Sequence, residues 1–177
     1  MTDEERDELF YRDTEAVAFP KIDDAQLSLL EPIGQRRTLH KGEIITKAGE
    51  RDLPLTIILR GEAEAFEVRD GVEQILATAG PRDFIGDVAT LQGTSALANA
   101  RVKSEEAEVL QISAARLQRV LAELPQVSKP IVNALIMRRR RLRRDREFAG
   151  MRVLALAETR EGHQLDDFLD KNHIPHR

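Results

Sequence analysis

The sequence contains no cysteine and no tryptophan, and its aromatic residues are one tyrosine and six phenylalanines. Without cysteine the chain has no disulfide, no thiolate metal ligand and no cysteine nucleophile. The four histidines lack metal-ligand spacing, and His173 and His176 fall in the last five residues, where we expect a solvated tail. We therefore predict no catalytic residue and no metal site in this chain.

Long hydrophobic runs are also missing. No stretch approaches the ~20 apolar residues that a membrane-spanning helix needs. The first ten residues, MTDEERDELF, have neither the basic start nor the apolar run of a signal peptide. We expect a cytoplasmic protein without a membrane partner.

Positive charge is concentrated in one place. Residues 138–146 hold seven arginines and one aspartate, although the whole chain has a net charge of −4. Arginines on one helix can contact phosphates, but nucleic-acid binders usually present a broad basic face. We predict no specific nucleic-acid binding. The run is interpreted either as a solvated helix or as a surface that docks on acidic groups, such as residues 3–15 or a missing catalytic domain.

Short elements alternate with turn residues through most of the chain. A helix is predicted over residues 3–18, ended by Pro20, and a second over 25–30, capped by Asp23 or Asp24. Glycines then recur at short intervals, and the apolar runs between them predict strands over residues 43–46, 54–61, 63–68, 73–78 and 107–112. Asp70-Gly71 predicts a hairpin turn. Such a series of short strands is typical of a small barrel or sandwich.

Two predicted helices follow the strands, and after them the sequence predicts a further strand and helix. Ser113 is expected to cap a helix that ends at Pro125, and a longer helix is expected over residues 131–148, with Pro130 in its first turn. Residues 151–157 then predict a buried strand and residues 162–172 a helix. Because one strand and one helix cannot bury both faces alone, we expect the chain to stop inside a second unit.

Three motifs in order carry a resemblance: KGEIITKAGE (residues 41–50), IILRGEAEAF (57–66) and AGPRDFIGDVATL (79–91). Together with the order of helices they resemble the cyclic nucleotide-binding domain of catabolite-activator-type regulators, kinase regulatory subunits and gated channels, over roughly residues 19–148. The resemblance implies a mainly β fold, a jelly-roll-like β-roll with flanking helices and a C-terminal helix. It also implies a homodimer through the helix at residues 131–148. The predicted domains are an acidic helix (1–18), the nucleotide-binding-like domain (19–150) and a partial unit (151–177).

Residues 84–102 correspond to the family's phosphate-binding cassette. There, amides at a helix start bind the cyclic phosphate, a glutamate accepts a hydrogen bond from the ribose hydroxyl, and an arginine pairs with the phosphate. Gly86 matches the family's glycine, and Asp87 stands in place of the glutamate. The arginine's position falls on Ser95 or Ala96, neither of which is a cation. The candidate ligand-binding residues are Gly86, Asp87, Val88, Ala89, Ser95, Ala96, Asn99 and Arg101, for a nucleotide or another small molecule.

The missing arginine leaves alternatives open. Arg101 either replaces it as a phosphate ligand or is a solvated strand residue. The pocket is either closed by apolar side chains such as Val88, Leu91 and Leu97, or takes a neutral or cationic ligand on polar groups of the cassette. On either reading we expect a cassette that binds cyclic nucleotides weakly or not at all.

Residues 152–176 carry a second resemblance, to the first strand and helix of a glutaredoxin-like unit. Where that unit has C-P-x-C, this chain has Thr159-Arg160-Glu161-Gly162. The combination resembles the N-terminal part of thioredoxin-reductase-like flavoproteins fused to a cyclic nucleotide-binding domain. It implies a C-terminal flavoprotein partner domain with FAD and NADPH, while this chain itself is a non-catalytic regulatory domain. The alternative is a catabolite-activator-type regulator without its DNA-binding domain.

Overall fold

The computed structural model describes residues 3–69, 71–86, 90–91 and 95–145, and divides the chain into two compact units, residues 1–139 and 140–177. The helices are α1 (Asp3–Ala18), α2 (Asp24–Leu30), the short 3-10 helix η1 (Glu31–Ile33), α4 (Ala114–Glu123) and α5 (Pro125–Asp145). The predicted partial unit at residues 151–177 lies outside the described residues.

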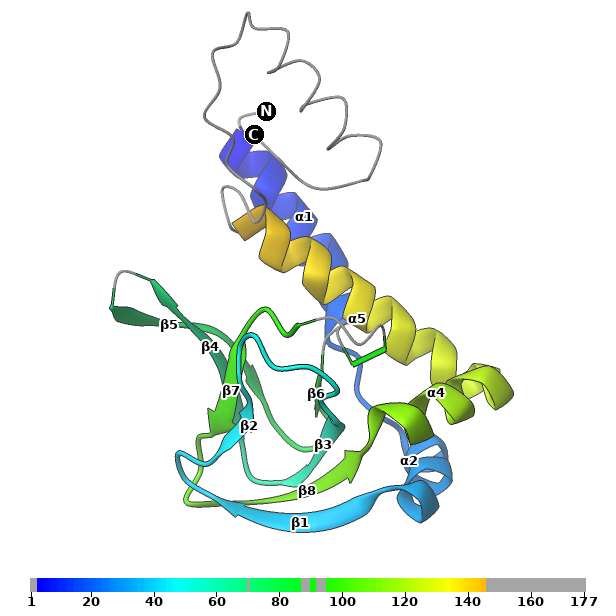
Figure 1. Cartoon of the computed structure of the whole chain (residues 1–177). Coiled ribbons are helices and arrows are strands. Elements are labelled where there is room, and N and C mark those ends of the chain that lie inside the picture. The colour runs from blue at the N-terminus through cyan, green and yellow to red at the C-terminus, as the bar shows by residue number, and fades with distance from the viewer. Residues whose placement is uncertain (1–2, 70, 87–89, 92–94, 146–177) are drawn as a thin grey trace, which may run out of the picture. The chain divides into compact units, whose positions relative to one another are not determined.

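The strands form two four-stranded antiparallel sheets (Figure 1). One sheet has the order β1-β8-β3-β6 and the other β2-β7-β4-β5. Their bounds are β1 (Gln35–His40), β2 (Ile44–Thr46), β3 (Leu55–Arg60), β4 (Ala63–Arg69), β5 (Val72–Ala79), β6 (Phe84–Ile85), β7 (Asn99–Val102) and β8 (Glu106–Ile112). The prediction of a mainly β, jelly-roll-like fold with flanking helices is confirmed.

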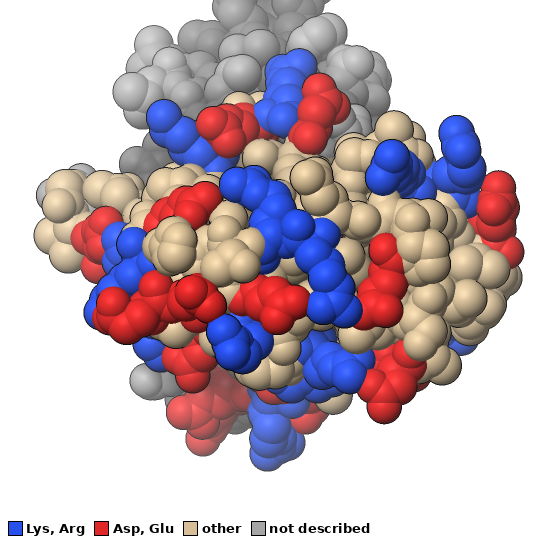
Figure 2. Space-filling view, turned by 90° about the horizontal axis from the view of Figure 1, so that it is seen from below, with Lys and Arg blue, Asp and Glu red and all other residues tan. Residues whose placement is uncertain are grey.

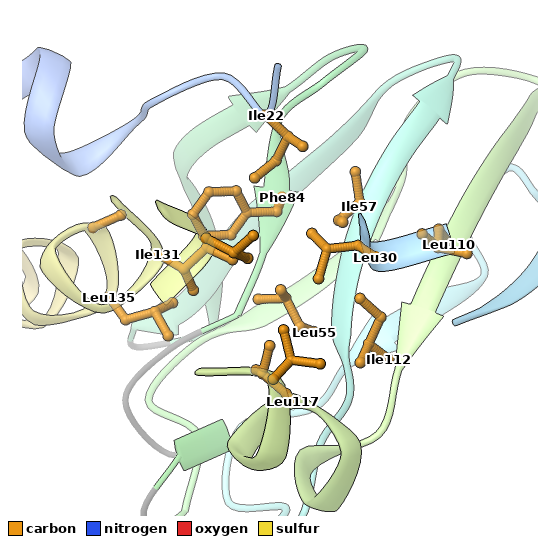
Figure 3. Packing of buried hydrophobic residues seen from close by; sticks show 13 residues of the cluster. Ile22, Leu30, Leu55, Ile57, Phe84, Leu110, Ile112, Leu117, Ile131 and Leu135 are labelled. Atoms are coloured by element: carbon orange, nitrogen blue, oxygen red, sulfur yellow. The ribbon is translucent and has the colours of Figure 1, made fainter. Parts of the chain in front are cut away.

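Strand β3 shows how the two-residue period of a strand separates two cores. Ile57 points into a cluster shared with the helices, whereas its neighbour Ile58 belongs to a cluster between the sheets. Both side chains are fully buried. The helix-side cluster collects Leu30 from α2, Leu117 from α4, and Ile131 and Leu135 from α5 (Figure 3).

The structure extends α5 toward the N-terminus relative to the prediction. The helix begins at Pro125 rather than at residue 131, so Pro130 lies inside it. Proline has no N–H and cannot bond the carbonyl four residues earlier. That carbonyl, on Gln126, instead accepts a hydrogen bond from Gln26 Nε2 at 3.1 Å. The side chain from α2 thereby offsets part of the cost of the internal proline.

Strand β1 was not predicted, because Leu39 is its only buried residue. The strand lies at a sheet edge and pairs with β8, and its outer face carries charge. Arg36 bonds Glu31 at 2.6 Å and Glu108 at 2.8 Å. Figure 2 shows basic and acidic side chains interspersed on this side of the molecule. A charged edge strand has too few apolar residues for alternating hydrophobicity to predict it.

Among the described residues, no helix combines the length and the apolar character that crossing a membrane requires.

Candidate functional site

Strand β6 leads the chain into the cassette. It pairs with β3, placing Phe84 opposite Ile57 and Ile85 opposite Thr56. Just before it, the Arg82 N–H donates to the Ile58 carbonyl at 2.8 Å. Phe84 is 1% exposed, so the entry to the cassette is fixed both by strand pairing and by burial.

Gly86 follows β6 and has a packing role in the structure. A Cβ at this position would lie 2.8 Å from Leu55 Cδ1 and 3.7 Å from Leu135 Cδ2. Atoms at 2.8 Å would overlap, so a larger residue here would have to push the end of the Leu55 side chain aside. The sequence had predicted a glycine for close approach to a phosphate, and the described atoms show close approach to the core.

The middle of the cassette is only partly described. The candidate ligands Asp87, Val88 and Ala89 lie outside the described residues. Thr90 is 2% exposed, and Leu91 packs against the helix-side core. The Leu91 carbonyl accepts a hydrogen bond from Gln118 Nε2 of α4 at 2.8 Å, so this stretch is attached to the helices.

The returning half of the cassette joins the turn after β2. The Ala96 N–H donates to the Glu50 carbonyl and the Gly49 N–H donates to the Ala96 carbonyl, both at 2.9 Å. Asn99 Oδ1 accepts from the Ala48 N–H at 3.0 Å. The structure thus brings Ala96 and Asn99 together on the glycine-containing turn of the first motif, and the Asn99 carbonyl oxygen is occupied by that turn.

Neither candidate for the arginine's place supplies a cation. Ala96 is 5% exposed and packed, whereas Ser95 is half-buried. A long side chain at residue 96 would therefore have to displace core atoms, but one at residue 95 has room to reach outward.

Arg101 of β7 is engaged by two carboxylates. Its Nε donates to Glu64 Oε1 at 2.8 Å, and its Nη2 lies 2.8 Å from Glu73 Oε2. Its guanidinium also lies 4.4 Å from the centroid of the Phe66 ring. The hydrogen bonds that Arg101 donates to Glu73 and then to Glu64 raise its pKa above the ordinary value. Arg101 is thus a partly exposed strand residue paired with carboxylates, because β4 and β5 place Glu64 and Glu73 on its face of the sheet.

The comparisons agree with this geometry. The family model described as the cyclic nucleotide-binding domain matches residues 36–123, which include both sheets except the start of β1. This is the cyclic nucleotide-binding fold. No curated protein is significantly similar to the sequence.

Solved structures share the fold at low sequence identity. The catabolite activator protein of Thermus thermophilus is 22% identical with a TM-score of 0.61, over 73% of this chain and 61% of that one. The regulator CLP of Xanthomonas campestris, described as c-di-GMP responsive, is 18% identical with a TM-score of 0.57, over 68% and 59%. The Toxoplasma gondii PKA regulatory domain crystallised with cAMP is 20% identical with a TM-score of 0.50, over 68% and 46%. The chain thus spans about three fifths or less of these proteins.

Arg138 of α5 is a residue that the sequence analysis did not single out. Its Nε donates to the Ala18 carbonyl at 2.6 Å and its Nη1 donates to the Phe84 carbonyl at 2.7 Å. Its guanidinium lies 5.0 Å from the ring centroid of Phe19 and 4.3 Å from that of Phe84. Burial lowers the pKa of Arg138 to about 10, and the negative charge of Asp83 opposes that shift. The side chain therefore remains charged at neutral pH.

A signal for Arg138 was present in the sequence. It follows Ile131 and Leu135 at helical spacing, and both of those residues are fully buried. The resemblance had implied a homodimer through the helix that carries these residues. In the structure the two apolar side chains pack in the domain's own core, so a dimer through α5 would need another of its faces and remains a prediction.

Proposed function

We propose that this chain is a non-catalytic regulatory domain whose cassette has lost its firm hold on a cyclic phosphate. The proposal rests on the arginines of the cassette, one of which is missing and one of which is already paired. Ser95 and Ala96 stand at the arginine's place, and Arg101, the nearest arginine along the cassette, is held by Glu64 and Glu73.

The missing ion pair sets the expected loss of affinity. A charge-assisted hydrogen bond contributes roughly 1.5–3 kcal/mol net, and an unpaired buried phosphate costs more. Since each ~1.4 kcal/mol is tenfold in affinity, binding falls by a factor on the order of 10 to 1000. We therefore expect dissociation constants for cAMP and cGMP above about 10 μM by isothermal titration calorimetry.

A variant at residue 95 tests whether the rest of a nucleotide pocket persists. Ser95→Arg restores a cation at a half-buried position, and Ser95→Met is the matched control with similar length and no charge. If the pocket is open, Ser95→Arg gains about tenfold or more in cAMP affinity and Ser95→Met gains none. If neither variant gains while circular dichroism stays native, the pocket is closed. Tight binding of cAMP by the unaltered chain would refute the proposal itself.

The fold does not determine which ligand a domain of this kind binds. The Toxoplasma domain was crystallised with cAMP, and the Xanthomonas regulator is described as c-di-GMP responsive, so the fold alone does not fix the ligand. Without a fixed cation, a neutral or cationic ligand suits the cassette of this chain better than a phosphate. Adenosine, which has the nucleoside without the phosphate, is the direct comparison in the same titrations.

A second candidate is a transcription regulator of the catabolite-activator kind, favoured by the similarity to the Thermus and Xanthomonas proteins. On this reading a DNA-binding domain belongs to the complete protein. The 177-residue chain should then bind duplex DNA only weakly and without sequence preference. A sequence-specific shift by the complete protein that withstands physiological salt would favour this candidate.

The fusion to a thioredoxin-reductase-like flavoprotein remains a prediction. It depends on residues 152–176, outside the described residues, and the comparisons lend it no support. FAD and NADPH would belong to the domains that follow. A G-x-G-x-x-G motif and a C-x-x-C motif encoded soon after Arg177 would support it, and their absence would remove it.

A further inference from the structure

Three segments distant in sequence meet just before the cassette. The segment after α1 reaches the turn before β6, where the Ile22 N–H donates to the Arg82 carbonyl at 2.9 Å. Lys21 Nζ bonds Asp83 Oδ2 at 2.7 Å and the Pro81 carbonyl at 3.2 Å. The third segment is α5, which contributes Arg138. Figure 3 shows Ile22 and Phe84 close to the side chains of α5.

A single guanidinium, that of Arg138, joins the end of one element to the start of another. Ala18 is the last residue of α1, and Phe84 is the first residue of β6. The final carbonyls of a helix lack partners within the helix and carry partial negative charge. Because the last turn of α1 has no basic residue, Arg138 supplies the cation for that end from another helix.

Arg138 is partly buried, and the desolvation of its guanidinium makes both contacts costly to lose. A desolvated charge is unfavourable unless its donors are satisfied, and this guanidinium donates to two backbone carbonyls. If the Phe84 carbonyl moves away, the guanidinium must find another acceptor or water. Either response disturbs its second contact, at Ala18.

The turn that precedes Phe84 is strained. Arg82 has a φ of +71° although it is not glycine, a conformation that costs free energy. Its Nη1 is buried with no hydrogen-bond partner among the described residues, while its Nη2 bonds Asp24 at 2.5 Å. A strained backbone position thus lies immediately before β6, the strand that Arg138 contacts.

We propose that Arg138 is a positioning residue that couples the cassette to α1. A displacement of β6 loosens the carboxyl end of α1, and a displacement of α1 changes the entry to the cassette, because coupling between two sites acts in both directions. This coupling goes beyond the proposed function and needs no ligand. Failure of its test therefore leaves the ligand question untouched.

The test perturbs the cassette and measures hydrogen exchange in α1. Gly86→Ala places a Cβ 2.8 Å from Leu55 beside β6. Gly34→Ala is the matched control, since its Cβ would lie 2.5 Å from Leu110 in the same helix-side core but away from β6. We expect Gly86→Ala to speed exchange at residues 8–18 about tenfold, and Gly34→Ala to change it less than about twofold.

The same measurement in an Arg138→Met background isolates the arginine. In that background α1 should already exchange faster, and adding Gly86→Ala should change it less than about twofold. Phe19→Leu, which removes one of the two rings from the guanidinium, provides a milder background if Arg138→Met does not fold. Amides of β3 and β8 report that the sheet is intact.

Two results would overturn the coupling. One is an equal effect of Gly34→Ala and Gly86→Ala on α1, which would mean that any core damage loosens the helix. The other is a full effect of Gly86→Ala on α1 in the Arg138→Met background, or in the Phe19→Leu background if Arg138→Met does not fold, which would mean that the coupling bypasses Arg138.

Discussion

Arg101 and Arg138 both place a guanidinium over a phenylalanine ring, 4.4 Å from the centroid of Phe66 and 4.3 Å from that of Phe84. Arg101 lies on a sheet face, keeps 26% of its side chain exposed and bonds two carboxylates. Arg138 is partly buried beside the helix-side core and bonds two backbone carbonyls. The ring contact is common to both, so it does not explain their different roles.

The difference lies in what satisfies each cation. Carboxylates neutralise Arg101, and surface ion pairs of this kind can be removed together at small cost. The hydrogen bonds of Arg138 go to neutral backbone carbonyls of α1 and β6 rather than to carboxylates. Altering Arg138 therefore changes how elements are held together, whereas altering Arg101 changes one face of one sheet.

The largest expected effect is on stability. Arg138→Met should lower the free energy of unfolding by about 2–3 kcal/mol, since two carbonyls lose charge-assisted hydrogen bonds and the relieved desolvation offsets only part of that loss. Urea denaturation followed by circular dichroism measures the change. Arg140→Met, at an exposed position of the same helix, should stay within about 0.5 kcal/mol of the unaltered protein. An equal loss in both variants would show that helix propensity, not the buried contact, is responsible.

A smaller effect is expected at Arg101, and it should depend on salt. Arg101→Met removes partly exposed ion pairs to Glu64 and Glu73, which ions in solution screen. Its destabilisation should shrink between low salt and about 1 M NaCl, where the Debye length is about 3 Å. The destabilisation by Arg138→Met should not shrink, because hydrogen bonds in the core are screened much less. The same salt dependence in the two variants would remove the distinction between them.

The fold was predictable from the sequence where local signals agree with burial. Glycine turns and alternating apolar residues predicted β3, β4, β5 and β8, and β4 pairs with β5 up to Arg69 and Val72, with a positive φ at Gly71 between them. Strand β1 was missed because its stability comes from pairing with β8 and from ion pairs, and neither is local in sequence. The start of α5 was misplaced because a side chain of α2 satisfies the carbonyl that Pro130 leaves free.

The candidate site was predictable as a location and less so as chemistry. The motifs identified the cassette and the absence of a cation at residues 95 and 96. They did not reveal the partners of Arg101, because Glu64 and Glu73 lie on other strands and only sheet register brings them together. The role of Arg138 could not be predicted either, because its acceptors are backbone carbonyls of distant segments and any residue type supplies a carbonyl.

The smallest expected effect concerns pH. Between about pH 6 and pH 9, the contribution of Arg138 to stability should not change. Burial lowers the pKa of Arg138 to about 10, so the folded state binds this proton more weakly than the unfolded state. The free energy of unfolding therefore rises with pH only between about 10 and the ordinary pKa of arginine, and below that window the group is charged in both states. The difference in stability between the unaltered protein and Arg138→Met should then be constant within about 0.5 kcal/mol from pH 6 to pH 9. A difference that changes steadily across this range would mean that Arg138 alters the titration of neighbouring groups. Its contribution to stability would then come partly from those groups and not only from its two carbonyl contacts.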